Sequence, residues 1–344
     1  MENTSSQPGN RNTMRVLTLE EHFATPAFLD GPGRHFKERA QAARALPQTA
    51  VSYATIIEQL CDISERRIAE MDAAGIDMQV LSLVSPGTEQ LAAADAVAIA
   101  REANDRLADA VRRHPTRFAG FATLPTAAPE TAADELERLV HDHGFKGAQI
   151  NGHIGERYLD DEFFWPILER AEALQTPIYL HPATPLPAVV KSLYAGNYAP
   201  EVTTLLADAA WGWHIETAVH VIRLILSGAF DRFPGLQFII GHLGEALPFM
   251  LPRLDSTLRP QVTKLQRPFS AYLRENVHYT FSGFNYLPTF LDLLLQVGVE
   301  RIMFSADYPF ASMTTARNFL EQLPVSPADR ERIAHGNAEQ LLGL

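Results

Sequence analysis

Short apolar runs alternate with longer helical patterns along almost the whole chain, and this alternation limits the fold more than any other feature. Eight runs have the length and the β-forming residues of buried strands, and helical patterns lie between them and after the last. The predicted strands cover residues 15–21, 78–84, 118–124, 147–151, 177–181, 237–242, 277–281 and 301–305. The predicted helices cover residues 64–74, 89–113, 129–143, 161–175, 213–227, 288–297 and 327–341. Such a repeat in 344 residues predicts an α/β fold of a single domain, the (β/α)8 or TIM barrel.

A doubly wound sheet is the main alternative for an alternating chain, but the first strand argues against it. Such a sheet usually has fewer strands and carries a glycine-rich phosphate loop after the first one. Here the first strand ends in Leu-Glu-Glu-His at residues 19–22, without glycine. We therefore expect residues 14–344 to form one barrel and the polar residues 1–13 to be a disordered or loosely attached tail.

Charge and cysteine content indicate which kinds of binding partner and which cellular compartment to expect for this chain. Acidic residues outnumber basic ones by 41 to 29, and this formal charge of −12 argues against nonspecific binding of nucleic acid. No run approaches the roughly 20 apolar residues of a membrane span, and the N-terminus lacks the apolar core of a secretory signal. The single cysteine, Cys61, cannot form an internal disulfide and fits a reducing compartment. We expect a cytoplasmic protein that binds neither nucleic acid nor a membrane.

Two connections are longer than the others, at residues 23–62 and 182–210. In a barrel, the loops that follow strands lie on the catalytic face, and long loops often act as lids, binding loops or subunit contacts. Both connections are therefore candidates for enclosing a substrate, and a purely structural contact between subunits is the alternative.

Five residues that can bind a metal or move a proton lie at the carboxyl ends of the predicted strands. They are Glu20, His22, His181, His242 and Asp307. Side chains two residues apart on a strand share a face, so Glu20 and His22 converge while Glu21 points away. The mouth of a barrel is where residues from different strands meet. We therefore expect these side chains to form one site.

The residue types fit a single divalent ion such as Mn, Zn or Mg. Two imidazoles and two carboxylates bind such ions and leave positions open for a substrate. His242 is then left over as an acid, a base or a hydrogen-bond donor. If a helix begins near Gly244, Glu245 can orient the His242 ring and favour its charged form. Arg253, further along that helix, can meet a carboxylate of its own substrate or of a neighbouring subunit.

The histidines of the helical pattern at 213–227 have a different interpretation. His214 and His220 have mostly apolar neighbours, and we expect them to be packing residues.

Several motifs appear together and in order, and their combination resembles a known family. They are Leu-Glu-Glu-His-Phe at 19–23, His-Pro at 181–182, Glu-Thr-Ala at 216–218, Gly-His-Leu-Gly-Glu-Ala-Leu-Pro-Phe at 241–249 and Ser-Ala-Asp-Tyr-Pro-Phe at 305–310. From residue 15 to residue 344 the chain resembles the amidohydrolase superfamily. More narrowly, it is similar to the metal-dependent nonoxidative decarboxylases of aromatic acids, such as γ-resorcylate, 2,3-dihydroxybenzoate and 5-carboxyvanillate decarboxylases. Most of the superfamily begins with His-x-His, whereas Glu20 gives the Glu-x-His variant of the decarboxylase branch.

The resemblance implies a role for each residue of the candidate site. The implied metal ligands are Glu20, His22, His181 and Asp307. The implied catalytic residues are Asp307 and His242, with Glu245 supporting His242. Arg253 matches an arginine that binds the substrate carboxylate. The resemblance also implies a homodimer or homotetramer.

The leading hypothesis is nonoxidative decarboxylation of a hydroxybenzoate-type acid with one divalent metal ion and no other cofactor, as part of aromatic compound catabolism. Either Asp307 or His242 would deliver the proton to the ring. Hydrolysis of a small lactone, amide or related aromatic-derived acid is the alternative, with the same metal activating water. A binding protein on a barrel scaffold without catalytic activity is the third hypothesis.

Overall fold

The computed structural model describes residues 14–43 and 53–344. The tail predicted at residues 1–13 lies outside the described residues. All eight predicted strands are present, and the third is divided into two short pieces. They are β1 (Leu17–Phe23), β2 (Met78–Leu83), β3 (Phe118–Gly120), β4 (Ala122–Thr123), β5 (Ala148–Asn151), β6 (Ile178–His181), β7 (Phe238–Ile240), β8 (Val277–Thr280) and β9 (Ile302–Met303). Every pair of neighbouring strands is parallel.

The strands follow one another in chain order around a barrel. Hydrogen bonds connect β1 to β2 and β3, and β4 through to β9. Only Phe121 separates β3 from β4, so the two pieces continue one strand. The ring closes where the segment after β9 meets β1: the His22 N–H donates to the Tyr308 carbonyl at 2.8 Å, and the Asp307 N–H donates to the Glu20 carbonyl at 3.0 Å. The predicted (β/α)8 barrel is confirmed.

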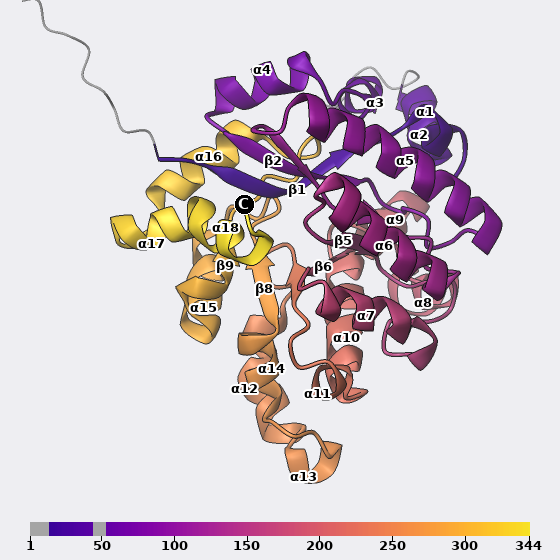
Figure 1. The fold of residues 1–344 in the computed structure, drawn as a ribbon. Helices are drawn as coiled ribbons and strands as arrows, with labels where there is room; N and C mark the ends of the chain where they lie inside the picture. The colour runs from indigo at the N-terminus through magenta and orange to yellow at the C-terminus, as the bar shows by residue number, and fades with distance from the viewer. Residues whose placement is uncertain (1–13, 44–52) are drawn as a thin grey trace, which may run out of the picture.

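Helices surround the strands on the outside (Figure 1). The α-helices are α1 (Pro26–Asp30), α2 (Arg34–Ala43), α3 (Tyr53–Cys61), α4 (Glu65–Ala74), α5 (Ala93–Arg113), α6 (Pro129–His143), α7 (Trp165–Ala173), α8 (Pro187–Val189), α9 (Pro200–Ala207), α10 (Gly212–Leu226), α11 (Ala229–Arg232), α12 (Leu247–Thr257), α13 (Pro260–Thr263), α14 (Phe269–Glu275), α15 (Leu287–Val297), α16 (Met313–Gln322), α17 (Pro327–Glu331) and α18 (Asn337–Leu342). Short 3-10 or π segments cover Glu162–Phe164, Val190–Tyr194, Val299–Arg301 and Arg332–Gly336. Along the described parts of the chain, no helix has the length and apolar character needed to span a bilayer.

Two apolar clusters hold these layers together. A small one fills the barrel interior and includes Leu17, Leu19, Val80, Phe121 and Tyr179, all fully buried. A much larger one lies between the strands and the surrounding helices. The strands bury both faces, as expected of a parallel sheet covered by helices.

The two long connections contain helices, which corrects their prediction as loops. The described part of the first holds α1, α2 and α3, and the second holds α8 and α9. Local sequence explains α1: Pro26 occupies its first turn, and the Thr25 hydroxyl accepts the Phe28 N–H at 3.2 Å. Phe28 and Phe36 are buried in the core, so this connection is part of the packed domain.

Candidate metal centre

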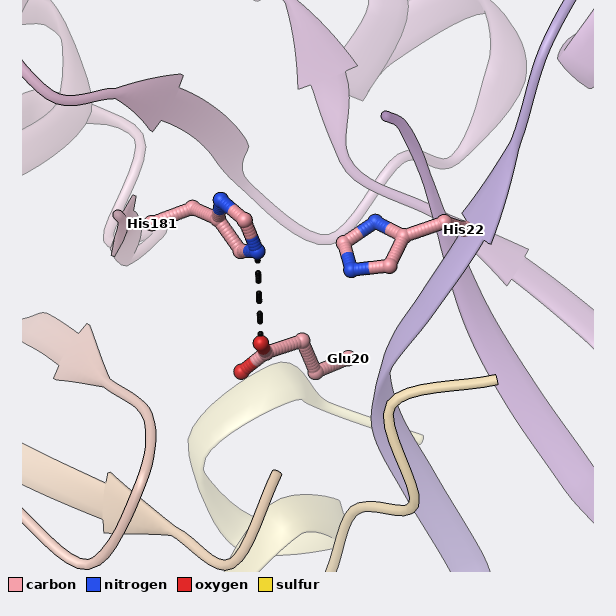
Figure 2. A group of neighbouring side chains, drawn as sticks. All are labelled: Glu20, His22 and His181. Carbon is pink, nitrogen blue, oxygen red and sulfur yellow. Dashed lines mark ion pairs between the residues drawn. The ribbon is translucent and has the colours of Figure 1, made fainter. Parts of the chain in front are cut away.

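The structure brings the five strand-end residues together at the carboxyl end of the barrel. Glu20 and His22 extend from β1, His181 from the end of β6, and His242 and Asp307 from the turns after β7 and β9. The His181 Nε2 lies 3.3 Å from the Glu20 Oε1, and the His22 Nε2 lies 3.3 Å from the Asp307 Oδ1. The His242 Nε2 lies 3.8 Å from the Glu20 Oε1. Figure 2 shows Glu20, His22 and His181 turned toward a common centre.

A β-bulge in the first strand directs these ligands into the barrel. The pairing of β1 with β2 shifts between Thr18 and Glu21, so β1 contains one residue more than its partner there. Leu17 and Leu19 face the barrel interior, and strict alternation would turn Glu20 outward. The extra residue lets Glu20 follow Leu19 on the inner side, with His22 beside it.

The two oxygens of Glu20 have different surroundings. Its Oε2 accepts hydrogen bonds from the Tyr179 and Ser282 hydroxyls, both buried. Its Oε1 is buried and has no hydrogen-bond partner among the described residues, and the same is true of the His22 Nε2. Buried polar atoms without partners are rare in native proteins. These two atoms face the centre of the cluster, where a cation would satisfy both.

The imidazoles are prepared to offer lone pairs to that centre. The Nδ1–H of His181 donates to the Pro182 carbonyl at 2.8 Å, so its Nε2 is the ring nitrogen that faces the centre. Burial and the neighbouring His181 lower the pKa of His22 to about 3, so its ring is neutral at pH 7. Neutral imidazole is the form that binds metals.

The carboxylates also favour a cation. Burial opposes the charged form of Glu20, but His242 and His181 outweigh it and lower the Glu20 pKa well below its usual range. Burial and the Glu20 carboxylate raise the pKa of Asp307 well above its usual range. Two carboxylates this close carry their charges together only with positive charge between them. Two imidazoles, two carboxylates and two unsatisfied inward-facing atoms therefore fit one divalent ion.

His242 belongs to a second group of buried residues beside the cluster. Its Nδ1–H donates to the Glu245 Oε1 at 2.6 Å, and the His214 Nδ1 lies 2.5 Å from the other oxygen of Glu245. Burial opposes the charged form of His242, but Glu245 and Glu20 together raise its pKa to about 10. His242 is therefore a cation at neutral pH, with its Nε2 facing Glu20. The expectation that His214 is a packing residue was wrong, because its Nδ1 contacts the Glu245 carboxylate. The two residues come from different segments of the chain, so this contact is not visible in the sequence.

The turn that holds His242 and Glu245 is not the start of a helix, which corrects that expectation. Residues 242–246 all have φ between 50° and 96°, the left-handed region, and α12 begins at Leu247. This conformation costs a non-glycine residue roughly 1–2 kcal/mol. Such strain is concentrated at functional sites, and here it folds Glu245 back onto the His242 ring.

Arg253 does not join these groups in the single chain. It lies on α12 with its side chain exposed, and none of the buried clusters in the described part of the chain includes it. In Figure 1, α12, α13 and α14 project together at the bottom of the view. The helix prediction for this segment was correct, but the structure places the guanidinium at the surface.

Another buried carboxylate, Glu89, gives a testable pH dependence. Glu89 lies before α5 rather than in it, and its Oε1 accepts the Asn151 N–H at 2.8 Å. Burial raises its pKa from 4.5 to about 7. The folded state then holds more protons than the unfolded state between these values, so stability falls as pH rises from about 4.5 to about 7.

We expect this group to remove about 3 kcal/mol of stability between pH 4.5 and pH 8. Glu89→Gln should therefore gain stability relative to the wild type as pH rises, which urea unfolding at a series of pH values measures. A constant difference between variant and wild type would contradict the assignment.

A parallel barrel with buried imidazoles and carboxylates at the carboxyl end of its strands is the architecture of a metal-dependent barrel enzyme. The amidohydrolase family model matches residues 58–344, and the chain belongs to this family. The γ-resorcylate decarboxylase of a Polaromonas species is 38% identical over 339 residues, covering 95% of this chain and 98% of the relative.

Solved structures of named decarboxylases are similar to this chain over nearly its whole length. A dihydroxybenzoic acid decarboxylase from Polaromonas, with bound manganese and the inhibitor 2-nitroresorcinol, has a TM-score of 0.85 at 37% identity and covers 96% of this chain and 97% of that one. A 5-carboxyvanillate decarboxylase from Novosphingobium aromaticivorans, with manganese and 4-hydroxy-3-methoxy-5-nitrobenzoic acid, has a TM-score of 0.87 at 34% identity and covers both chains fully.

Proposed function

We propose that this protein is a metal-dependent nonoxidative decarboxylase of a hydroxybenzoate-type aromatic acid. The observation that carries the proposal is the buried Glu-x-His pair of β1, joined by His181 and Asp307 in one cluster. The near full-length relatives are named as decarboxylases of γ-resorcylate, dihydroxybenzoic acid and 5-carboxyvanillate, which supports carbon–carbon cleavage over hydrolysis. The proposal includes a cytoplasmic enzyme in which residues 14–344 form one catalytic domain.

Glu20, His22, His181 and Asp307 would hold the ion in this proposal. Manganese is the ion in the solved relatives. A bound divalent ion supplies positive charge that fixes and neutralises the substrate carboxylate and its ortho oxygen. Tyr179 and Ser282 hold the other oxygen of Glu20, so that it offers one oxygen to the site.

Asp307, whose protonated form is favoured by burial and by Glu20, would deliver its carboxyl proton to the ring and become the carboxylate. Direct loss of carbon dioxide would leave an electron pair in the plane of the ring as an aryl carbanion. Protonation of the carboxylate-bearing carbon first forms a C–H bond, and the electron pair of the breaking C–C bond then restores the aromatic ring. The His242 cation, held by Glu245, is the rival donor and can otherwise hydrogen-bond a substrate oxygen.

A second copy of the chain is expected to complete the substrate site. Next to Arg253, the surface of the packed helices α12 and α15 exposes large apolar side chains. They are Phe249, Met250, Leu291 and Leu295. Exposed apolar patches of this kind are typical of protein interfaces. We propose a homodimer or homotetramer in which Arg253 binds the substrate carboxylate of its own or of a neighbouring subunit.

Replacing Arg253 by glutamine should raise KM at least about tenfold, because a hydrogen bond to a charged group contributes about 1.5–3 kcal/mol. Arg113→Gln, an exposed position on α5, is the matched control and should leave KM unchanged. Co-expression of Arg253→Gln with Asp307→Asn distinguishes the two arrangements. Activity recovered in mixed oligomers would show that Arg253 acts on the substrate of a neighbouring subunit. An unchanged KM in the Arg253→Gln variant alone would exclude a role for Arg253 in either subunit.

A panel of hydroxybenzoates with carbon dioxide detection tests the reaction itself. Manganese-loaded protein should release carbon dioxide from at least one ortho-hydroxylated acid, whereas chelator-treated protein should not until manganese is restored. No release from any acid of the panel would contradict the proposal.

A further inference from the structure

Glu21, between the two inner ligands of β1, has a distinct set of contacts. It is fully buried, and its side chain points away from Glu20 and His22. Burying a carboxylate is costly unless it is hydrogen-bonded. Its partners are therefore informative about why an acid stands at this position.

The Glu21 carboxylate accepts the backbone amides on both sides of Asp307. One oxygen accepts the Ala306 N–H at 2.9 Å, and the other accepts the Tyr308 N–H at 3.2 Å. The side-chain amide of Gln79 donates to the second oxygen at 3.1 Å. A single side chain thus holds the backbone before and after Asp307.

Asp307 needs such support because its backbone is in an unfavourable conformation. Its φ is +68°, in the left-handed region that residues other than glycine rarely adopt. Its own N–H donates to the Glu20 carbonyl at 3.0 Å. Three successive amides, 306 to 308, therefore point at β1, and this arrangement turns the Asp307 carboxylate to within 3.3 Å of the His22 Nε2.

We propose that Glu21 is a positioning residue that sets the place of the Asp307 carboxylate in the metal centre. This inference rests on the proposed role of Asp307 as a ligand, but not on the identity of the reaction. Three consecutive residues of β1 would then have complementary tasks: Glu20 and His22 bind the ion, and Glu21 holds the ligand that comes from the far end of the chain.

A separate set of contacts keeps this region folded without Glu21. The buried Arg67 donates to the His22 carbonyl at 2.5 Å, and its guanidinium lies 4.7 Å from the centre of the Tyr308 ring. The Tyr308 hydroxyl donates to Glu70 at 2.6 Å. Weakening the carboxylate contacts should therefore move Asp307 while β1 and the segment after β9 stay together.

Glu21→Gln tests the proposal with manganese affinity as the readout. Glutamine has nearly the same size as glutamate but replaces one accepting oxygen by an NH2 group. This group would face a backbone N–H and cannot accept a hydrogen bond from it. Loss of an outer partner of a metal ligand weakens metal binding about 10–100-fold, and we expect a loss in this range by equilibrium dialysis. Glu135→Gln is the matched control, since Glu135 is also a buried carboxylate but bonds Asn104 and Arg138 on the helices. It should leave manganese affinity unchanged.

A double-mutant cycle shows whether Glu21 acts through Asp307. Asp307→Asn should weaken manganese binding, and Glu21→Gln should add little in that background. A loss that is fully additive, or a folded Glu21→Gln with wild-type affinity, would overturn the proposal. If Glu21→Gln does not fold, Glu21→Asp, which keeps both oxygens on a shorter side chain, is measured in the same cycle with the same criteria. Dialysis measures metal binding and requires no turnover. The role of Glu21 can therefore be tested even if no decarboxylated substrate is found, and failure of the proposed function is not confused with failure of this inference.

Discussion

Asp307→Asn is expected to lower kcat by about a thousandfold or more at saturating manganese, with the fold intact. Asparagine keeps the shape of the side chain but has no acidic proton to give to the ring carbon. General acid–base groups typically contribute about 10²–10⁴-fold, and this residue also faces the metal centre. Steady-state turnover, with bound manganese quantified in the same samples, measures the effect. Asp142→Asn, an exposed carboxylate on α6, is the matched control.

His242→Asn identifies the proton donor by comparison. If Asp307 is the donor, His242→Asn should lose less turnover than Asp307→Asn, because it removes a charged hydrogen bond rather than the transferred proton. The opposite order would assign the transfer to His242. Activity of Asp307→Asn within tenfold of the wild type would contradict a catalytic role for Asp307.

Glu20→Ala is expected to lower manganese affinity by more than about 100-fold. Loss of a residue that only supports a metal ligand costs up to about 100-fold, and loss of a ligand itself should cost more. The variant loses Glu20 Oε1, a buried oxygen that faces the imidazoles and has no hydrogen-bond partner among the described residues. Metal content by mass spectrometry after dialysis measures the loss, and activity should disappear with it.

Tyr179→Phe supplies the matched comparison for Glu20. It leaves the carboxylate in place and removes one of the two hydroxyls that hold its second oxygen, while the Ser282 hydroxyl remains. We expect a smaller loss of affinity, about tenfold. Equal affinity of Glu20→Ala and the wild type would exclude Glu20 as a ligand.

The strands and the inward-facing residues were predictable because both follow simple rules of position. Each apolar run of the barrel ends where the chain reaches the mouth, so a polar residue such as His181 or Asp307 directly after a run is visible in the sequence. Alternation along β1 separated Glu20 from Glu21, but the β-bulge that lets Glu20 follow Leu19 on the inner side was not visible in the sequence. The barrel followed from the same runs, since eight parallel strands in chain order have few other ways to bury both faces.

Other parts of the site depend on contacts between segments far apart in the chain. Tyr179 within β6 and Ser282 just after β8 look like ordinary residues of the barrel core, and only the fold brings their hydroxyls to Glu20. His214 lies among apolar residues of α10, and its contact with Glu245 arises from the left-handed turn at residues 242–246. The sequence 305–310 contains no signal for this conformation at Asp307, which is why the task of Glu21 becomes visible only in the structure.

The mass and isotope content of the product formed in deuterium oxide test the central claim most directly. Manganese-loaded protein is incubated in this solvent with an ortho-hydroxybenzoate that it consumes, and the product is examined by mass spectrometry and NMR. Nonoxidative decarboxylation predicts a phenol that has lost carbon dioxide and carries one deuterium at the vacated ring carbon, with no oxygen consumed. A product that retains the carboxylate and has gained the elements of water would contradict the account and favour hydrolysis.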